Sequence, residues 1–347
     1  MGAESGARAR TSKKTGFVYI NPAKRKPSQY EEITLHTQWD PRNFAVAGWF
    51  NLDKNGQPPW REDATLLKAS DWWEYRDPNA EWFRPFVKRQ ADIGRSIEQT
   101  IAGAKRAKTC AAFDASWTEF LQTHYAAYRF AEYGLFLILC QAQREAGSDV
   151  VAQPMIFQSV EKDRHAQDIT LYCMELESQI EGFSDARAKD TWMDAPEWQG
   201  LRRVTEYLLA CRDWGEIYLV VNCLLEPLVS SLICRELILR NAPRHGDVIT
   251  SVIAQAAESC RENSTASTKA FVELLLKQAP EHNLAVIKTW FEKWLPLVEQ
   301  AAQDITPLFA TLDLCNTDGS EALNNVKTDF NKFIADLGLT SILEVGA

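Results

Sequence analysis

The stretch that decides the fold is a short charged run near the middle of the chain, Glu161-Lys162-Asp163-Arg164-His165. It lies inside residues 152–181, where apolar residues recur at steps of three and four, the spacing of one face of an α-helix. His165 falls on that apolar face, in line with Ile169 and Leu176. Because a buried polar ring needs a hydrogen-bonding or charged partner, a neighbouring element must supply one.

The expected partner is a carboxylate in the preceding helix, residues 114–145. Glu132 lies in the apolar stripe of that helix, so we expect it to point inward and to meet His165. The alternative is a solvated Glu132 on the surface. If Glu132 is buried, an ion pair with Lys162, Arg164 or His165 that fixes the register of the two helices is favoured over a catalytic role.

Long helices continue through the rest of the chain, where proline is sparse. The expected helices span residues 87–109, 114–145, 152–181, 198–212, 214–241, 247–278, 282–302 and 320–337. Pro227 and Pro296 fall inside two of them and predict kinks. Helices of about 30 residues exceed the usual length in globular proteins and suit a large bundle. No alternating strand pattern occurs, so the predicted fold class is all-α.

The N-terminal region differs in composition. Residues 1–28 carry seven basic residues against one acidic residue and are predicted to be a flexible basic tail. Residues 29–85 are predicted to form an irregular aromatic arm, before a helical domain at residues 86–347. Its six tryptophans are interface candidates: Trp39, Trp49, Trp60, Trp72, Trp73 and Trp82. Each can bury on the order of 200 Å², so the arm must cover its own helical body, another chain or both.

Composition excludes several classes of function. The 347 residues carry a net charge of −9, which does not favour nucleic-acid binding. The first fifteen residues are polar, and the most apolar stretches, such as 217–225, fall short of the roughly 20 residues that span a bilayer, so a cytoplasmic protein is expected. No C-x-x-C, Gly-x-Ser-x-Gly, P-loop or G-x-G-x-x-G motif occurs. The histidines other than His165 are expected at the surface.

The run at 161–165 resembles the ferritin-like di-iron carboxylate proteins, whose bundles bind iron through single Glu residues and two Glu-x-x-His pairs. It is most similar to the hydroxylase components of bacterial multicomponent monooxygenases. On that resemblance, the positions that correspond to metal ligands are Glu132, Lys162, His165, Arg261 and Ser264. The remaining ligand position falls on Glu226 or, in another register, on Val221.

The aromatic arm carries a second resemblance. One run of it looks like the start of the small (β) subunits of these hydroxylases: Trp72-Trp73-Glu74-Tyr75-Arg76-Asp77-Pro78. Together the two resemblances cover most of the chain, from about Thr34 to beyond Trp294.

The histidines test whether a di-iron site is present. The residues three positions before the five histidines are Ile33, Leu121, Lys162, Ala242 and Ala279. No Glu-x-x-His therefore occurs, and Lys162 and Arg261 would put cations where the irons should lie. The sequence predicts no catalytic residue, no cofactor and no metal in this chain.

The resemblance implies a non-catalytic small subunit of a monooxygenase. A homologous large subunit would hold the di-iron centre and pair with this chain in an (αβ)₂ assembly, served by a small effector protein and an NADH-dependent reductase. The chain length and arm look most like the propane and tetrahydrofuran enzymes, with phenol, toluene or alkene monooxygenases as alternatives. Two other hypotheses stay open: a helical adaptor unrelated to oxygenation, and an independent oxidase with an unorthodox metal site.

Overall fold

The computed structural model describes residues 26–35, 61 and 63–343. Within those residues the secondary structure is helical, with no strand, which confirms the all-α prediction. The long helices are α3 (Phe83–Ala107), α5 (Ala126–Glu145), α6 (Asp149–Gln179), α8 (Pro196–Ala210), α10 (Val248–Gln278), α11 (Pro280–Ile305) and α12 (Gly319–Asp336). Their bounds lie within four residues of those expected from the sequence, with one exception: the helix expected at residues 114–145 is divided into α4 (Ala115–Phe120), the π-helical η3 (Leu121–Tyr125) and α5, which begins only at Ala126.

Shorter helices complete the described chain. The α-helical ones are α1 (Gln29–Thr34), α4 (Ala115–Phe120), α7 (Ala188–Asp194), α9 (Trp214–Val220) and α13 (Thr340–Leu343). The 3₁₀ helices are η1 (Trp72–Glu74), η2 (Thr109–Ala112), η6 (Ala242–His245) and η7 (Thr306–Thr311). The π-helices are η3 (Leu121–Tyr125), η4 (Val221–Ser230) and η5 (Leu232–Leu239).

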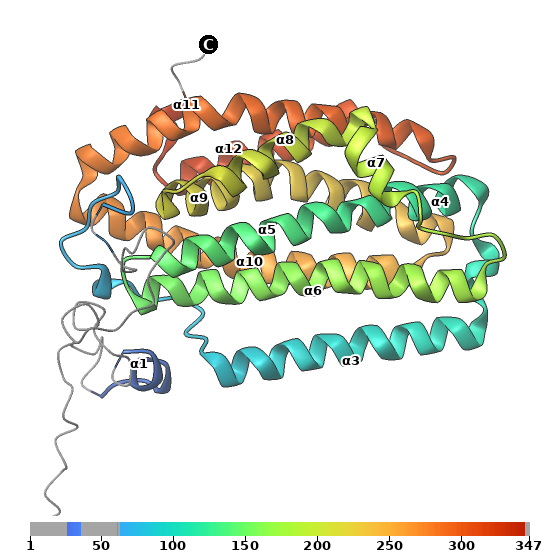
Figure 1. The fold of residues 1–347 in the computed structure, drawn as a ribbon, viewed down its shortest axis with the longest axis horizontal. Helices are drawn as coiled ribbons and strands as arrows, with labels where there is room; N and C mark the ends of the chain where they lie inside the picture. The colour runs from blue at the N-terminus through green and yellow to red at the C-terminus, as the bar shows by residue number, and fades with distance from the viewer. Residues whose placement is uncertain (1–25, 36–60, 62, 344–347) are drawn as a thin grey trace, which may run out of the picture.

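The long helices form a bundle (Figure 1). Helices α5 and α6 pack side by side as an antiparallel hairpin, α10 lies behind them, and α11 runs along the upper edge of the view. Helix α3 lies along the lower edge, outside α6. Ser148 caps the start of α6, where its side chain accepts a hydrogen bond from the backbone of Val151. The hairpin therefore brings the faces of Glu132 and His165 together.

The central helical run, Trp214–His245, passes through the core as α9, η4 and η5. This run is long and apolar enough to span a membrane, whereas the sequence predicted only shorter apolar stretches. However, 94% of its most apolar window is buried inside the protein, as in the core helix of a soluble protein. Pro227 lies within η4, where the Ser231 N–H donates to the Glu226 carbonyl five residues earlier. The chain accommodates this proline by π-helical turns.

Part of the arm is helical rather than irregular, so the prediction for residues 29–85 is wrong at α1. The Ser28 side chain accepts from the Glu31 N–H, and the Glu31 carboxylate accepts from the Ser28 N–H at 2.9 Å. This capping box satisfies two backbone donors that would otherwise lack partners, and Ser-x-x-Glu was visible in the sequence. Helix α3 also begins inside the predicted arm, at Phe83.

The described tryptophans of the arm cover the chain's own body. Trp72 packs edge-on to Trp214, with ring centroids 5.2 Å apart, and stacks on Phe271 at 6.2 Å. Trp73 is half-buried against the same core, and Trp82 is half-buried at the start of α3. Trp39, Trp49 and Trp60, like residues 1–25 of the predicted tail, lie outside the described residues.

Candidate functional site

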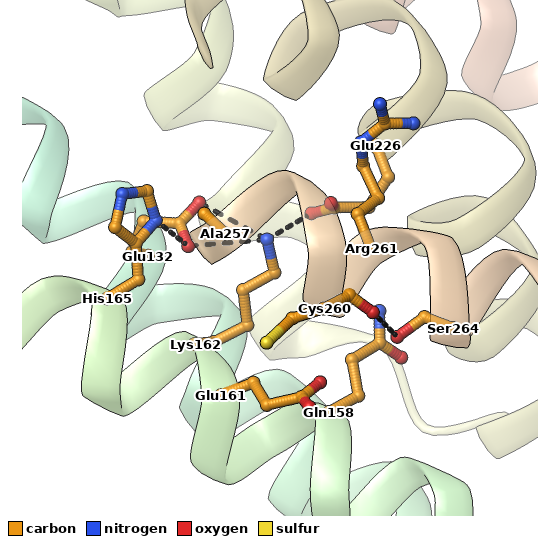
Figure 2. A pocket seen from close by; sticks show the side chains of 10 residues that line it. All are labelled: Glu132, Gln158, Glu161, Lys162, His165, Glu226, Ala257, Cys260, Arg261 and Ser264. Carbon is orange, nitrogen blue, oxygen red and sulfur yellow. Dashed lines mark hydrogen bonds and ion pairs between the residues drawn. The ribbon is translucent and has the colours of Figure 1, made fainter. Parts of the chain in front are cut away.

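A small cavity lies between α5, α6, η4 and α10, at the place that the charged run marks (Figure 2). Its volume is about 20 Å³, room for roughly one water molecule. All five positions singled out from the sequence line it, namely Glu132, Lys162, His165, Arg261 and Ser264. The folded chain therefore gathers these residues from three helices at one point.

Lys162 lies at the centre of the cluster. Its ammonium nitrogen lies 2.7 Å from Oε1 of Glu226 and 3.3 Å from Oε2 of Glu132. The His165 ring places Nδ1 2.9 Å from the same Oε2 of Glu132. The Glu132 side chain is fully buried, that of Glu226 is 2% exposed and that of Lys162 is 12% exposed. The buried alternative for Glu132 is therefore correct, and its partners are Lys162 and His165.

Glu226, and not Val221, reaches the cluster. The sequence left these two positions open because each fits a different α-helical register. Residues 221–230 are π-helical, and a π-turn holds more residues than an α-turn, so side chains drift around the helix axis relative to an α-helical count. The Glu226 carboxylate also accepts from Ser230 Oγ at 3.1 Å.

Arg261 and Ser264 line the cavity without joining the central ion pairs. The Arg261 guanidinium pairs with Glu258, one turn earlier on α10. Ser264 Oγ donates to the backbone carbonyl of Cys260 at 3.4 Å. The second cation expected at the site is thus neutralised by its own helix, and Lys162 is left to neutralise the carboxylates of α5 and η4.

The ionisation of the cluster follows from burial and charge. Burial by itself raises the pKa of the Glu132 carboxyl, but Lys162 and His165 outweigh burial and hold that pKa below its ordinary value. Burial lowers the pKa of Lys162, yet Glu132 and Glu226 outweigh it and raise that pKa. Both groups are therefore ionised at neutral pH, and the cluster is a buried salt-bridge network.

This network predicts a pH dependence of stability. A carboxyl whose pKa is depressed in the folded state contributes stability above its unfolded pKa, which is 4.5 here, and loses it as the pH falls through the folded value. Lys162, whose folded pKa is raised, contributes below its unfolded pKa of 10.5 and loses this only at higher pH. We expect Glu132→Gln to lower the free energy of unfolding at pH 7 and this loss to shrink toward pH 3. Chemical denaturation at both pH values measures it, and a loss independent of pH would contradict the assignment.

The cluster does not fit a divalent metal ion as it stands. In the part of the chain that the structure describes, no group of three His, Cys, Asp or Glu side chains lies close enough to hold one. Between Glu132 and Glu226 stands an ammonium group, which carries only N–H donors and no lone pair to give to a metal. Its positive charge would repel a metal ion at the same place.

Comparison with known proteins places the chain in a family. The methane/phenol/alkene hydroxylase family matches residues 49–279. This chain belongs to that family. Its sequence is 32% identical over 342 residues to the hydroxylase component small subunit of propane 2-monooxygenase from Mycolicibacterium smegmatis, covering 97% of this chain and 92% of that protein.

A further relative has a similar sequence, and a solved structure has a similar fold. The methane monooxygenase component A beta chain of Methylococcus capsulatus is 28% identical over 334 residues, with 93% of this chain and 86% of that chain covered. The fold matches a solved structure of phenol hydroxylase from Pseudomonas sp. OX1 with a TM-score of 0.75 at 17% identity, over 90% of this chain and 91% of that one. These hydroxylase-family relatives include small and beta subunits of larger hydroxylase components.

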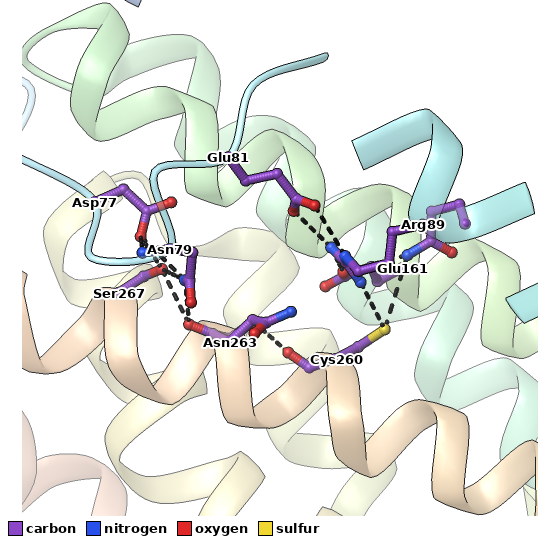
Figure 3. A network of polar contacts seen from close by, with 10 residues as sticks. Asp77, Asn79, Glu81, Arg89, Glu161, Cys260, Asn263 and Ser267 are labelled. Atoms are coloured by element: carbon purple, nitrogen blue, oxygen red, sulfur yellow. Dashed lines mark hydrogen bonds and ion pairs between the residues drawn. The ribbon is translucent and has the colours of Figure 1, made fainter. Parts of the chain in front are cut away.

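A second polar network in this hydroxylase-family chain ties α3 to the bundle beside the cavity (Figure 3). The Arg89 guanidinium lies between two carboxylates, with Nη2 2.6 Å from Glu81 and 2.7 Å from Glu161. Burial raises the pKa of Glu161, and Arg89 counteracts this. Because Glu161 also lines the cavity, α3 supplies the cation that pairs with this carboxylate. The apolar spacing of the sequence did not predict that Arg89 would contact Glu161.

The segment before α3 is held on α10 by hydrogen bonds in the same network. Ser267 Oγ donates to Asp77 Oδ1 at 2.9 Å, and Asn79 Nδ2 donates to the Asn263 carbonyl at 2.9 Å (Figure 3). Nearby, Tyr75 is buried and its hydroxyl donates to the Ser267 carbonyl at 3.0 Å. Residues 75–81 are thus an integral part of the body.

His245 corrects the expectation that the other histidines are surface groups. Its side chain is fully buried, pairs through Nδ1 with Asp114 and stacks on Trp117 at 4.7 Å. It ends the central helical run, whose end lies inside the bundle. The nearby Asp247, the first residue of the helix predicted at 247–278, is buried and accepts hydrogen bonds from Trp117 and Tyr172.

Proposed function

We propose that this chain is the non-catalytic small (β) subunit of the hydroxylase component of a soluble di-iron monooxygenase. A homologous large subunit that carries two Glu-x-x-His motifs would hold the di-iron centre, and the two would assemble as (αβ)₂. The observation that carries the proposal is the position of the Lys162 ammonium between Glu132 and Glu226, at 3.3 and 2.7 Å, where a metal ion would need free carboxylate lone pairs.

The substrate class is assigned from the relatives. The similarity over 97% of the chain to small subunits of propane 2-monooxygenase supports NADH- and O₂-dependent hydroxylation of propane or a similar small hydrocarbon by the complex. An NADH-dependent reductase and a small effector protein would serve it in the cytoplasm. The lower identity to the beta subunit of toluene-4-monooxygenase from Ectopseudomonas mendocina, 23% over 294 residues, makes an aromatic substrate the second candidate.

The first experiment is an affinity purification of the full chain from its native host, with mass spectrometry of the partners and iron analysis of the complex. We expect a larger chain with two Glu-x-x-His motifs, and iron that remains with that chain after the subunits are separated. Iron bound stoichiometrically by the isolated small chain would favour the independent oxidase. Recovery of the chain without such a partner and without iron would favour the adaptor.

The interface role of the arm needs a different test from removal of residues 1–85. Such a truncation would delete Trp72 and Tyr75, which pack on the chain's own core, and would damage the fold itself. We expect the triple variant Trp39→Ala, Trp49→Ala and Trp60→Ala to weaken assembly with the large subunit at least tenfold. Sedimentation of the purified complex measures it, with circular dichroism as the control for folding. Unchanged assembly would place these tryptophans elsewhere than at the interface.

A further inference from the structure

The buried cluster places the Lys162 ammonium between two carboxylates, 3.3 Å from Glu132 and 2.7 Å from Glu226. Three elements contribute: α5 provides Glu132, α6 provides His165 and Lys162, and η4 provides Glu226 (Figure 2). We propose that the Lys162 ammonium is a tethered counter-ion that holds these elements together as a divalent metal ion would. Shortening Lys162 then converts the cluster into a one-metal site. This inference concerns the chain alone and does not depend on the partner.

The charges around the cluster single out Lys162. Glu161 on α6 is paired with Arg89 from α3, and Glu258 is paired with Arg261 on α10. Among the described residues, the cation in ion-pair contact with Glu226 is Lys162. Without it, Glu226 would keep the hydroxyl of Ser230 as its described side-chain donor, and two carboxylates would face each other beside a cavity with room for roughly one water molecule. A cation from solvent would then be attracted to them.

The donors that remain are those a first-row divalent metal uses. Carboxylate oxygens and an imidazole nitrogen bind such ions at about 2.0–2.2 Å. The carboxylates now lie 2.7 and 3.3 Å from the Lys162 nitrogen, so they would close by about 1 Å around a bare ion. His165 Nδ1 lies 2.9 Å from the Glu132 oxygen that faces Lys162. The three donors are too far apart to hold an ion as they stand, and His165 would become the third ligand once the carboxylates close on the ion.

Space is also available. Lys162→Ala removes four side-chain atoms next to a cavity of about 20 Å³, which leaves room for an ion and for water molecules that complete its coordination. With Lys162 in place, by contrast, the counter-ion is part of the chain. The wild-type protein should therefore fold and keep its stability in the presence of a chelator.

Co²⁺ alone is the probe, because its visible absorption reports the coordinating atoms. The full chain is compared as wild type, Lys162→Ala, Lys162→Met and the double variant Lys162→Ala with Glu226→Gln. We expect Lys162→Ala to bind one Co²⁺ per chain at least tenfold more tightly than wild type in equilibrium dialysis. Its Tm should rise with added Co²⁺, because the ion binds only the folded state. Lys162→Met fills the space without charge, and the double variant lacks one carboxylate. Each should therefore bind Co²⁺ at least tenfold more weakly than Lys162→Ala.

Each outcome decides the proposal. Lys162→Ala that folds, as judged by circular dichroism, but binds Co²⁺ no better than wild type overturns it. If Lys162→Ala does not fold alone, it is refolded with Co²⁺: recovery of the helical spectrum supports the proposal, and failure to recover overturns it. Equal binding by the double variant and Lys162→Ala also overturns it, since the ion would then lie elsewhere. The affinity purification of the native complex can fail or succeed independently of these results.

Discussion

Lys162→Met is expected to lower the free energy of unfolding by about 3–5 kcal/mol, the usual cost of removing one partner from a buried ion pair. Methionine keeps most of the volume of the lysine side chain, so the loss comes from charge rather than from a cavity. Glu226 loses its ion pair at 2.7 Å and Glu132 loses the one at 3.3 Å. Both carboxylates are then buried without a compensating ammonium group.

Chemical denaturation at pH 7 measures this effect, and Lys277→Met is the matched control. Lys277 also pairs with a glutamate, at 3.0 Å from Glu74, but its side chain is 71% exposed. Exposed pairs contribute less than about 1 kcal/mol, so the control should change little. Lowering the pH should narrow the gap between Lys162→Met and wild type, because protonation removes the unpaired buried charges. A loss below about 1 kcal/mol at pH 7 would show that solvent already screens the cluster.

Asp247→Ala is expected to have the second large effect, a loss of about 3–5 kcal/mol. The Asp247 side chain caps α10 by accepting from the Ile249 and Thr250 N–H groups at 3.0 Å. It also accepts from Trp117 Nε1 and the Tyr172 hydroxyl, each at 3.0 Å. Loss of a helix cap costs about 1 kcal/mol, and each buried donor left without an acceptor costs about 1–3 kcal/mol more.

Asp318→Ala is the control for the capping contribution alone. Asp318 caps α12 through the Glu321 N–H at 2.8 Å, but its side chain is exposed and, within the described part of the chain, bonds to no buried ring or hydroxyl. We expect a loss of about 1 kcal/mol there. Thermal unfolding of both variants separates the two contributions. If the two losses are equal, Trp117 and Tyr172 have found other acceptors or water, and the buried network is weaker than its geometry indicates.

Local features of this fold were readable from the sequence. Apolar spacing located the long helices because each buries one face, and that requirement acts on every turn of the chain. The capping box at Ser28 and Glu31 is equally local and could have been recognised, although the density of prolines and tryptophans around it favoured an irregular arm. The absence of Glu-x-x-His before any histidine is also a property of the sequence alone.

The candidate site was only partly predictable. The pairing of Glu132 with His165 followed from two inward-facing polar residues on consecutive antiparallel helices, because a short connection makes the two helices neighbours and buried polar groups need partners. The choice between Glu226 and Val221 could not be made, since π-helical turns change the register of a helix and have no reliable sequence pattern. Arg89 was not identified either, because its partner Glu161 lies 72 positions away in the sequence.

By itself, then, the sequence determined the all-α class, the approximate helix bounds and the loss of the di-iron motif, because these depend on residue types at fixed short spacings. Tertiary structure alone decided that Lys162 neutralises both Glu132 and Glu226. It also decided that Asp247, which caps α10, accepts hydrogen bonds from Trp117 and from Tyr172 on α6. Buried charges and donors must find partners wherever the folded chain brings them, and the distances that settle this exist only after the helices have packed.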